Sequence, residues 1–377
     1  MPSLLYVGDL GPGLTSQDRA DALASLGAEV DAIGPDRPRG IRGKIDWVMS
    51  SRLQISRSIR RLNALMAEKL SARKYDILWL DKGWQIQPAT LAALRSRVSS
   101  IVLFNNDNPW GGHERGMWRL HKGIVPMIDE VMVPKYSVIR PYERLGARRV
   151  SVVDFGYAPA RHFAPDKSIT KTEEICFIGT ALKDGGGIRP PRTEIMLELG
   201  RLLPGRISIY GHGWKKALGG AERYFHVIAD GAWDNVYRET IWKSKINLSF
   251  VTKDNWEESS HRAFEITACG GCLLAERSSR LEQSFTEGEE ALYFERAVDC
   301  AELATRLLND DAKRDSIASV GHRRAVGSGY DNQSRLAEAI VRSPVLRGHF
   351  SLRNQVSPKS GSGAGHAPFG REDRVMS

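Results

Sequence analysis

Residues 246–276 read INLSFVTKDNWEESSHRAFEITACGGCLLAE, and this stretch decides the fold. The apolar run 246–250 predicts a buried strand, and the run 271–275 predicts another. Between them, a polar loop leads into a helix that we expect to begin near residues 259–260 and to end at the glycine pair 270–271. A strand, a crossover helix and a further strand form the repeating unit of a parallel α/β sheet.

The same rhythm extends through most of the chain in both directions from this unit. Short apolar runs separated by helix-length segments are typical of buried strands in doubly wound parallel sheets. The runs span 4–7, 28–33, 77–80, 101–105, 130–133 and 150–154 in the first half, and 174–179, 206–211, 225–229, 246–250, 271–275 and 291–295 in the second. The sequence therefore predicts an α/β protein with two Rossmann-like domains, each built on a parallel sheet.

A break separates the two series of strands. Residues 154–173 lack apolar periodicity and contain two prolines, which is typical of an interdomain linker. We therefore expect an N-terminal domain over 1–155, a linker over 156–172 and a C-terminal domain over 173–342. Residues 343–377 include SPKSGSGAGHAPFG and are predicted to form a disordered tail.

Length and composition exclude several classes of protein. The chain has 377 residues, of which 41% are hydrophobic, which is enough for two domains with cores of their own. No window approaches the ~18 consecutive apolar residues of a spanning helix, and the start lacks the features of a signal peptide. Four cysteines are too few and too unevenly placed for a disulfide framework. We therefore expect a cytoplasmic protein with reduced thiols.

Most of the net charge of +9 lies in residues 51–74, which hold seven Lys and Arg and one Glu. Since the basic residues do not form a stripe with interleaved aromatic residues over a domain, we expect no nucleic-acid partner. The apolar residues of this segment recur at helical spacing, opposite Arg57, Arg60 and Arg61; they are Ile55, Ile59, Leu62, Met66 and Leu70. The basic face is either solvated or docks on an acidic acceptor or an anionic membrane, which would make the protein peripheral at the inner membrane surface.

The first loop, GDLGPGLTS at 8–16, follows a predicted strand and opens a helix. Gly11 and Gly13 let the backbone approach a ligand closely, and Thr15 with Asp18 predicts a capping box. The glycine spacing does not match the dinucleotide fingerprint, which argues against a dehydrogenase. The loop is either shaped for an acceptor or is simply a tight turn.

Glu265 lies about a turn and a half into the helix predicted from residues 259–260. A carboxylate there can accept both vicinal hydroxyls of a ribose, while Arg262 and the free N–H groups of the first turn can neutralise a diphosphate. These are the two halves of a nucleotide sugar. The alternative is a surface Glu and Arg on an ordinary amphipathic helix.

Several motifs around this helix resemble those of a known family. They are the run 262–276, FTEGEE at 285–290, CFIGT at 176–180 with Arg192, IYGHGW at 209–214, residues 237–248 and RDSIASVG at 314–321. Upstream, FNNDNPW at 104–110, FGYAP at 155–159 and FAP at 163–165 add to them. With these motifs the chain resembles glycosyltransferases of the GT-B fold over roughly residues 1–340, and is most similar to the branch that includes the CgeB-type spore-maturation proteins.

The resemblance implies two domains that face each other across a cleft, and transfer of a sugar to an acceptor hydroxyl without a metal or other cofactor. The donor would be a nucleoside diphosphate sugar, linked to UDP, GDP or dTDP, and Glu265 would hold its ribose. The other candidate donor-binding residues are Gly179, Gly211, His212, Gly213, Lys253, His261 and Arg262. The acceptor would be a glycan, a lipid or a protein, bound near Gly11, Gly13, Thr15 and Asn108.

Two carboxylates are candidate catalytic residues. Glu257 and Glu265 have the Glu-x7-Glu spacing of many retaining members of the fold, but the Phe-Gly that usually follows the first Glu is replaced here, which leaves the stereochemistry open. Asp107 follows a predicted strand and precedes Asn108, so it either projects into the cleft as a base or sugar ligand or forms an Asx turn. The Cys269–Cys272 pair ends a helix and has no second pair nearby, which favours packing over redox or zinc chemistry.

Two alternative functions keep the same fold. One is a sugar-nucleotide epimerase of the GT-B type, which would need further acid and base groups around the sugar and no acceptor. The other is a non-catalytic protein that binds a glycan or a membrane.

Overall fold

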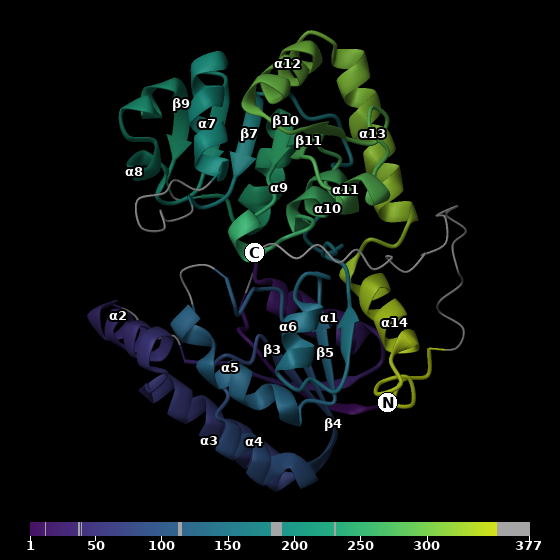
Figure 1. Cartoon of the computed structure of the whole chain (residues 1–377). Coiled ribbons are helices and arrows are strands. Elements are labelled where there is room, and N and C mark those ends of the chain that lie inside the picture. The colour runs from purple at the N-terminus through teal and green to yellow at the C-terminus, as the bar shows by residue number, and fades with distance from the viewer. Residues whose placement is uncertain are drawn as a thin grey trace, which may run out of the picture.

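The computed structural model describes residues 1–352 apart from positions 12, 37, 39, 112–114, 182–190 and 230. Two α/β domains stack on each other, and the chain runs from the lower to the upper one in Figure 1. The lower, N-terminal sheet has the order β2-β1-β3-β4-β5-β6, with all neighbouring strands parallel. Its strands are β1 (Ser3–Val7), β2 (Glu29–Ile33), β3 (Tyr75–Asp81), β4 (Val98–Phe104), β5 (Glu130–Val133) and β6 (Val150–Val152).

The upper, C-terminal sheet is also fully parallel, in the order β12-β11-β10-β7-β8-β9. Its strands are β7 (Glu173–Ile178), β8 (Ile207–Tyr210), β9 (Phe225–Ile228), β10 (Ser244–Ser249), β11 (Leu273–Glu276) and β12 (Leu292–Phe294). This is the Rossmann order, whose switch point lies between β7 and β10, where ligands bind in such sheets. The predicted fold class, with two Rossmann-like parallel sheets, is confirmed.

Helices cover both faces of each sheet. The N-terminal domain has α1 (Thr15–Ser25), α2 (Gly40–Val48), a π-helix (Met49–Leu53), α3 (Arg57–Ala72), α4 (Pro88–Leu94), α5 (Arg119–Ile124) and α6 (Ile139–Arg144). The rest of the chain has α7 (Pro191–Leu202), α8 (Trp214–Leu218), α9 (Asp234–Lys243), α10 (His261–Ala268), α11 (Ser279–Ser284), α12 (Ala297–Leu308), α13 (Asp311–Gly327) and α14 (Asn332–Arg342). Among the described residues, no helix combines the length and the apolar character needed to cross a membrane.

The central strands are buried on both faces, which explains their continuous apolar runs. In the N-terminal sheet, Leu5 and Leu78 belong to the core beneath α3, while Leu4 and Trp79 belong to the core beneath α1. Burial at about 25 cal/mol per Å² of apolar surface is the main stabilising term for such a sheet. The four cysteines are buried and free, which fits packing.

The chain crosses between the domains twice, and the two crossings lie side by side. Tyr157 in the first crossing donates its N–H to the Tyr330 carbonyl at 3.1 Å, and its own carbonyl accepts from the Asn332 N–H at 2.8 Å. After the second crossing, α14 packs beside α1 on the N-terminal domain (Figure 1), where Leu336 and Ile340 share a core with Leu23.

This return differs from the expected boundaries. We expected α14 to belong to the C-terminal domain and residues 343–377 to be disordered, but Leu346, Phe350 and Leu352 are buried in the N-terminal core. The apolar side chains of α14 and the segment after it find their partners on the first sheet rather than the second. The rest of the predicted tail, 353–377, lies outside the described residues.

In the basic segment 51–74, residues 51–53 end the π-helix, and the α-helix begins only at Arg57, where α3 starts. Ser56 caps the helix by accepting a hydrogen bond from the Ile59 N–H at 3.1 Å. The predicted stripe is buried from Ile59 to Leu70, but Ile55 precedes the cap and is 57% exposed, so its assignment to the stripe is wrong.

Candidate functional site

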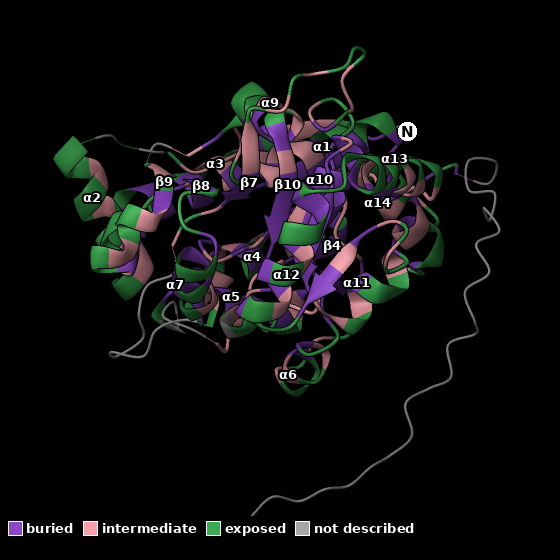
Figure 2. Ribbon diagram, turned by 90° about the horizontal axis from the view of Figure 1, so that it is seen from above, coloured by how far each residue is buried: buried purple, intermediate pink, exposed green. Residues whose placement is uncertain are grey.

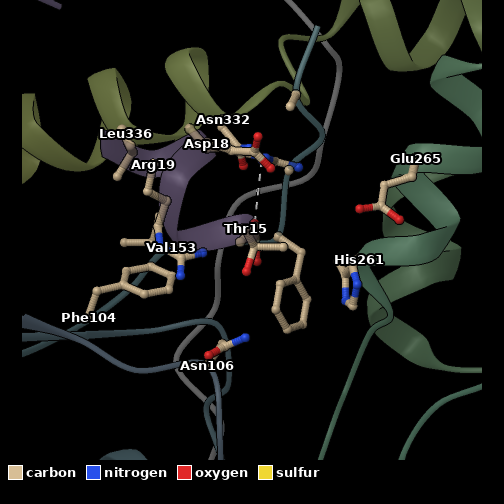
Figure 3. A pocket seen from close by; sticks show the side chains of 15 residues that line it. Thr15, Asp18, Arg19, Phe104, Asn106, Val153, His261, Glu265, Asn332 and Leu336 are labelled. Carbon is tan, nitrogen blue, oxygen red and sulfur yellow. Dashed lines mark ion pairs between the residues drawn. The ribbon is translucent and has the colours of Figure 1, made fainter. Parts of the chain in front are cut away.

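A cavity lies where the two domains meet, between α1 and α10 (Figure 3). Thr15, Asp18 and Arg19 line it from α1, and His261 and Glu265 line it from α10. The predicted start of α10 is confirmed, because the helix begins at His261 with Ser260 as its N-cap. Since α10 follows β10 at the switch point of the second sheet, its first turns lie where such sheets bind ligands.

The Glu265 carboxylate is buried in this cavity and ionised. Its Oε2 accepts a hydrogen bond from the Tyr237 hydroxyl at 2.7 Å, and its Oε1 lies 3.8 Å from Nε2 of His162. Burial would raise the pKa of Glu265, but His261, His162, Arg262 and the Tyr237 hydrogen bond outweigh it and lower the pKa to about 2. Glu265 can therefore accept hydrogen bonds over the whole physiological pH range.

His162 fixes one side of this carboxylate. Its Nδ1 accepts a hydrogen bond from the Ala158 N–H at 3.1 Å, so in the neutral ring the hydrogen sits on Nε2 and faces Glu265. Burial lowers the pKa of His162, which keeps the ring neutral. Neither His162 nor Tyr237 could be predicted from sequence as a partner of Glu265, because they lie 103 and 28 positions away in the chain.

Arg262 adds a cation beside Glu265. Its guanidinium lies 5.4 Å from the centre of the Tyr237 ring. Its Nη1 is buried and has no hydrogen-bond partner among the described residues. A buried N–H without a partner costs free energy, which a bound anion would recover. A carboxylate and a cation thus lie within one turn at the start of α10.

The predicted glycine loops lie at the carboxyl ends of β7 and β8 and pack against each other. A Cβ on Gly211 would lie 2.1 Å from the Gly179 carbonyl oxygen, which also accepts from Nε1 of Trp214 at 2.6 Å. Gly213 has a φ of 83°, and the His212 carbonyl accepts from the Ala181 N–H at 2.9 Å. These contacts explain the glycines by packing; residues 182–190, which continue the β7 loop, lie outside the described residues.

Lys253 and Glu257 belong to the loop that connects β10 with α10. Lys253 pairs with the buried Glu276 at 2.8 Å. Glu257 accepts hydrogen bonds from the Thr252 N–H at 2.9 Å and from Nδ2 of Asn255 at 3.0 Å. Neither residue lines the cavity between α1 and α10, so the predicted Glu-x7-Glu pair is split between this loop and that cavity.

The same loop contacts the N-terminal domain. Asn255 accepts from the Asn108 N–H at 2.8 Å through its side chain, and from Nζ of Lys135 at 2.7 Å through its carbonyl. Asp107 and Glu257 both raise the pKa of Lys135 by their charge. The charges of the two predicted catalytic carboxylates thus both act on Lys135, a residue that could not be singled out from the sequence.

The buried Lys135 makes the free energy of unfolding depend on pH. Burial lowers its pKa to about 8, although Glu257, Asp107 and Glu258 oppose the shift. The unfolded chain, with a lysine pKa of about 10.4, holds a proton between pH 8 and 10.4 that the folded protein has lost, so stability rises with pH across this window. We expect urea titrations to show that the free energy of unfolding of the wild type rises by roughly 2–3 kcal/mol across this pH window. The free energy of unfolding of Lys135→Met should not show this rise. An equal pH dependence of the free energy of unfolding in both proteins would contradict this role of Lys135.

Asp107 pairs with Nζ of Lys82 at 2.7 Å. Burial would raise the pKa of Asp107, but Lys82 and Lys135 outweigh it and lower the pKa. A carboxylate held this way is a weak base and a good hydrogen-bond acceptor. The Asx turns of this loop are made by its neighbours, since Asn105 accepts from the Asp107 N–H and Asn108 from the Trp110 N–H.

Asp107 and Lys82 line a second cavity, of about 840 Å³, at the carboxyl ends of β1, β3 and β4 in the N-terminal domain. Thr15 and Arg19 line both cavities, so the two cavities adjoin each other at α1. Arg19 is held by a bidentate pair with the buried Asp81, at 2.6 and 2.9 Å, and Tyr6 donates to the same carboxylate at 2.6 Å. The sequence analysis missed this buried charge cluster.

The predicted capping box at the start of α1 is wrong. The N-cap is Leu14, without a side-chain hydrogen bond, and Asp18 instead pairs with Arg161 of the linker at 3.0 Å. Gly11 closes a tight turn, in which its carbonyl accepts from the Leu14 N–H at 3.3 Å. Gly13 has a φ of 78°, and a Cβ there would lie 2.7 Å from Oδ1 of Asp234 on α9. The loop therefore contacts the C-terminal domain.

Residues 192–341 match the model of a family described as glycosyl transferase-like. They cover most of the C-terminal domain, including the whole of α10. No curated protein sequence matches the chain.

Solved structures share the complete two-domain arrangement. Sucrose-phosphate synthase from Thermosynechococcus elongatus is 13% identical, with a TM-score of 0.64 over 90% of this chain and 98% of that one. HepE of Anabaena, solved with UDP and glucose, is 12% identical, with a TM-score of 0.59 over 91% and 100%. Trehalose 6-phosphate synthase from Burkholderia multivorans is 13% identical, with a TM-score of 0.60 over 92% and 99%. These likenesses show the GT-B fold, while membership of the CgeB-type branch stays a prediction.

Proposed function

We propose that this protein is a glycosyltransferase that moves a sugar from a nucleoside diphosphate sugar to an acceptor hydroxyl. The donor binds to the C-terminal domain at the start of α10, and the acceptor binds in the N-terminal cavity. The match of residues 192–341 to a glycosyl transferase-like family supports this proposal, as does the shared fold with HepE, which was solved with UDP and glucose.

The observation that carries the proposal is the ionised Glu265 beside Arg262, whose buried Nη1 has no hydrogen-bond partner in the described part of the chain. Among the residues that the structure describes, Oε1 of Glu265 has no partner closer than His162 at 3.8 Å, so it can accept from a ribose hydroxyl. Arg262 and the first-turn N–H groups of α10 offer positive charge for a diphosphate. A diphosphate is common to every donor that we expect, and UDP- and GDP-sugars also carry a ribose with both vicinal hydroxyls.

In the proposed reaction, the acceptor hydroxyl attacks the anomeric carbon of the donor sugar, and the bond to the diphosphate breaks. Negative charge then grows on the leaving diphosphate, where Arg262 and the N-terminus of α10 stabilise it. Asp107, which Lys82 keeps ionised, accepts a hydrogen bond from the acceptor hydroxyl, and the proton that this hydroxyl loses passes to the leaving diphosphate. Glu257 stabilises, by its hydrogen bonds, the loop between β10 and α10 that contacts the N-terminal domain.

The leaving-group assignment predicts how Arg262 and metal ions affect turnover. We expect Arg262→Ala to lower kcat by about two orders of magnitude, since a charge that acts on the transition state is lost. Chelation by EDTA should leave turnover unchanged, because the fixed cation replaces a divalent ion. Initial rates with and without EDTA test both. Activity that EDTA abolishes and magnesium or manganese restores would contradict the assignment.

The products identify the reaction class. Incubation with UDP-, GDP- and dTDP-sugars, followed by chromatography, should show a free nucleoside diphosphate together with a transferred or hydrolysed sugar. Release of an epimerised donor would instead support the epimerase alternative.

We also propose that the protein is cytoplasmic and touches the inner membrane surface through residues 51–74. Arg57, Arg60 and Arg61 of α3 are exposed there, which supports contact with anionic lipid.

A further inference from the structure

Helix α2 is unusual in burying none of its nine residues. It forms the edge of the N-terminal domain and projects from the body of the molecule (Figure 2). Together with residues 49–55 it presents six exposed large apolar side chains, and we call residues 40–55 the α2 surface. The side chains are Ile41, Ile45, Trp47, Val48, Leu53 and Ile55, with exposed fractions between 46% and 78%.

This concentration of exposed apolar side chains indicates that the α2 surface binds a partner. A helix of nine residues is marginal in water without packing, because nucleation is costly. Exposed apolar residues scattered singly are ordinary, whereas contiguous ones mark an interaction site. In the part of the chain that the structure describes, no other stretch of this length exposes more than two large apolar side chains.

The charges around the α2 surface select an anionic partner. Six basic residues of the segment 40–61 are exposed: Arg42, Lys44, Arg52, Arg57, Arg60 and Arg61. The only acidic residue of the segment, Asp46, turns inward and accepts from the Ser58 N–H at 3.3 Å. A second copy of the chain would bring the same positive charge to this surface, so like charges would oppose self-association through it. Apolar side chains with basic neighbours are the pattern of a surface that lies on an anionic bilayer.

The α2 surface adjoins the N-terminal cavity. Lys44 and Trp47 line that cavity from α2, and the Trp47 ring meets the edge of Trp84 at 5.9 Å between ring centres. Anything that covers the α2 surface therefore also covers one wall of the cavity that we assign to the acceptor.

We propose that the α2 surface docks on an anionic lipid bilayer and holds the mouth of the N-terminal cavity at the membrane. The apolar side chains enter the region between headgroups and acyl chains, and the basic residues bind lipid phosphates. Resting on the proposed function, this places acceptor hydroxyls at the depth of the lipid headgroups. It also extends the contact of residues 51–74 to α2, which supplies the apolar part of the contact.

Co-sedimentation with vesicles tests the proposal. We expect the full-length protein to bind vesicles of equal parts phosphatidylglycerol and phosphatidylcholine, and to bind vesicles of phosphatidylcholine alone at least about tenfold more weakly. Val48→Asp should weaken binding to the anionic vesicles by roughly tenfold or more. The matched control is Val326→Asp on α13, because Val326 is 49% exposed and Val48 is 46% exposed. Reversal of Arg57, Arg60 and Arg61 to Glu should abolish the dependence on anionic lipid.

The outcomes separate this proposal from the proposed function. Absence of vesicle binding, or equal binding of Val48→Asp and the control, would overturn the docking proposal. So would a dimer, seen by light scattering, that Val48→Asp dissociates. Hydrolysis of a nucleotide sugar in solution depends on neither Ile45 nor Val48, so its presence alongside failed vesicle binding would leave the glycosyltransferase proposal intact. Vesicle binding without any reaction of nucleotide sugars would support the docking proposal and contradict the glycosyltransferase proposal.

Discussion

Glu265→Gln is expected to bind nucleoside diphosphates about 10- to 150-fold more weakly than the wild type, which corresponds to roughly 1.5–3 kcal/mol for hydrogen bonds to a charged acceptor. The substitution keeps the shape of the side chain but removes its charge. A free ribonucleotide and its nucleotide sugar should lose the same free energy, because both carry the ribose, whereas dTDP lacks the 2′-hydroxyl and should lose less. Isothermal calorimetry with UDP, GDP and dTDP measures this directly.

The loss of affinity must be separated from a loss of stability. The pKa of Glu265 is lowered from its ordinary value to about 2, so its carboxylate also stabilises the folded protein. This contribution is present above about pH 4.5 and is lost as the pH falls toward 2, and its full value is about 3 kcal/mol. Titrations therefore belong at a temperature where the variant is folded, as shown by circular dichroism. Glu239→Gln on α9, whose carboxylate is about half exposed, is the matched control. Unchanged affinity in Glu265→Gln would remove Glu265 from the site.

Asp81→Asn is expected to lower the free energy of unfolding by about 3–5 kcal/mol, because it leaves the buried guanidinium of Arg19 without its counter-charge. The side chains of Asp81 and Arg19 are only 1% and 9% exposed, and Tyr6 donates a hydrogen bond to the same carboxylate. Urea denaturation measures the change. Replacing both partners, as in Arg19→Met with Asp81→Leu, should recover much of the loss, since no uncompensated charge remains.

Asp299→Asn provides the comparison for Asp81→Asn. Asp299 pairs with Arg296 at the exposed start of α12, and solvent screens such a pair, so little change is expected. A small effect of Asp81→Asn, similar to that of Asp299→Asn, would show that the cluster of Arg19, Asp81 and Tyr6 does not hold the end of the first sheet together.

The fold could be predicted because its signal is local. The central strands of both sheets are buried on two faces, so their sequences read as continuous apolar runs, as in 101–105 and 246–250. The start of α10 could be predicted for the same reason, since a polar loop and a change of period mark it. Parallel topology then follows from the helix-length segments between the strands.

The partners of the site residues could not be predicted, because contacts between distant segments place them. His162 reaches Glu265 only after the linker has turned back on α9 and α10, and Lys135 reaches Asn255 across the domain contact. At the start of α1, the ion pair of Asp18 with Arg161 replaces the local capping bond that sequence spacing favoured. In each case tertiary packing decides between chemically similar options.

The packing of α14 on the N-terminal domain could not be predicted from the sequence for the same reason. Its amphipathic pattern predicts a helix but does not say which sheet receives the apolar face. In the structure α1 receives this face, because Ala20 and Leu23 form one core with Leu336 and Ile340.

The most direct test of the central claim, that the start of α10 binds a nucleoside diphosphate sugar, is a thermal-shift panel of UDP-, GDP- and dTDP-sugars on the wild type and on Glu265→Gln. A ligand at a hundredfold excess over its Kd stabilises the folded protein by about 2.7 kcal/mol, which raises the Tm by several degrees. The account predicts such a shift for at least one nucleotide series in the wild type and a much smaller one in Glu265→Gln. No shift with any nucleotide at millimolar concentration, or equal shifts in both proteins, would contradict it.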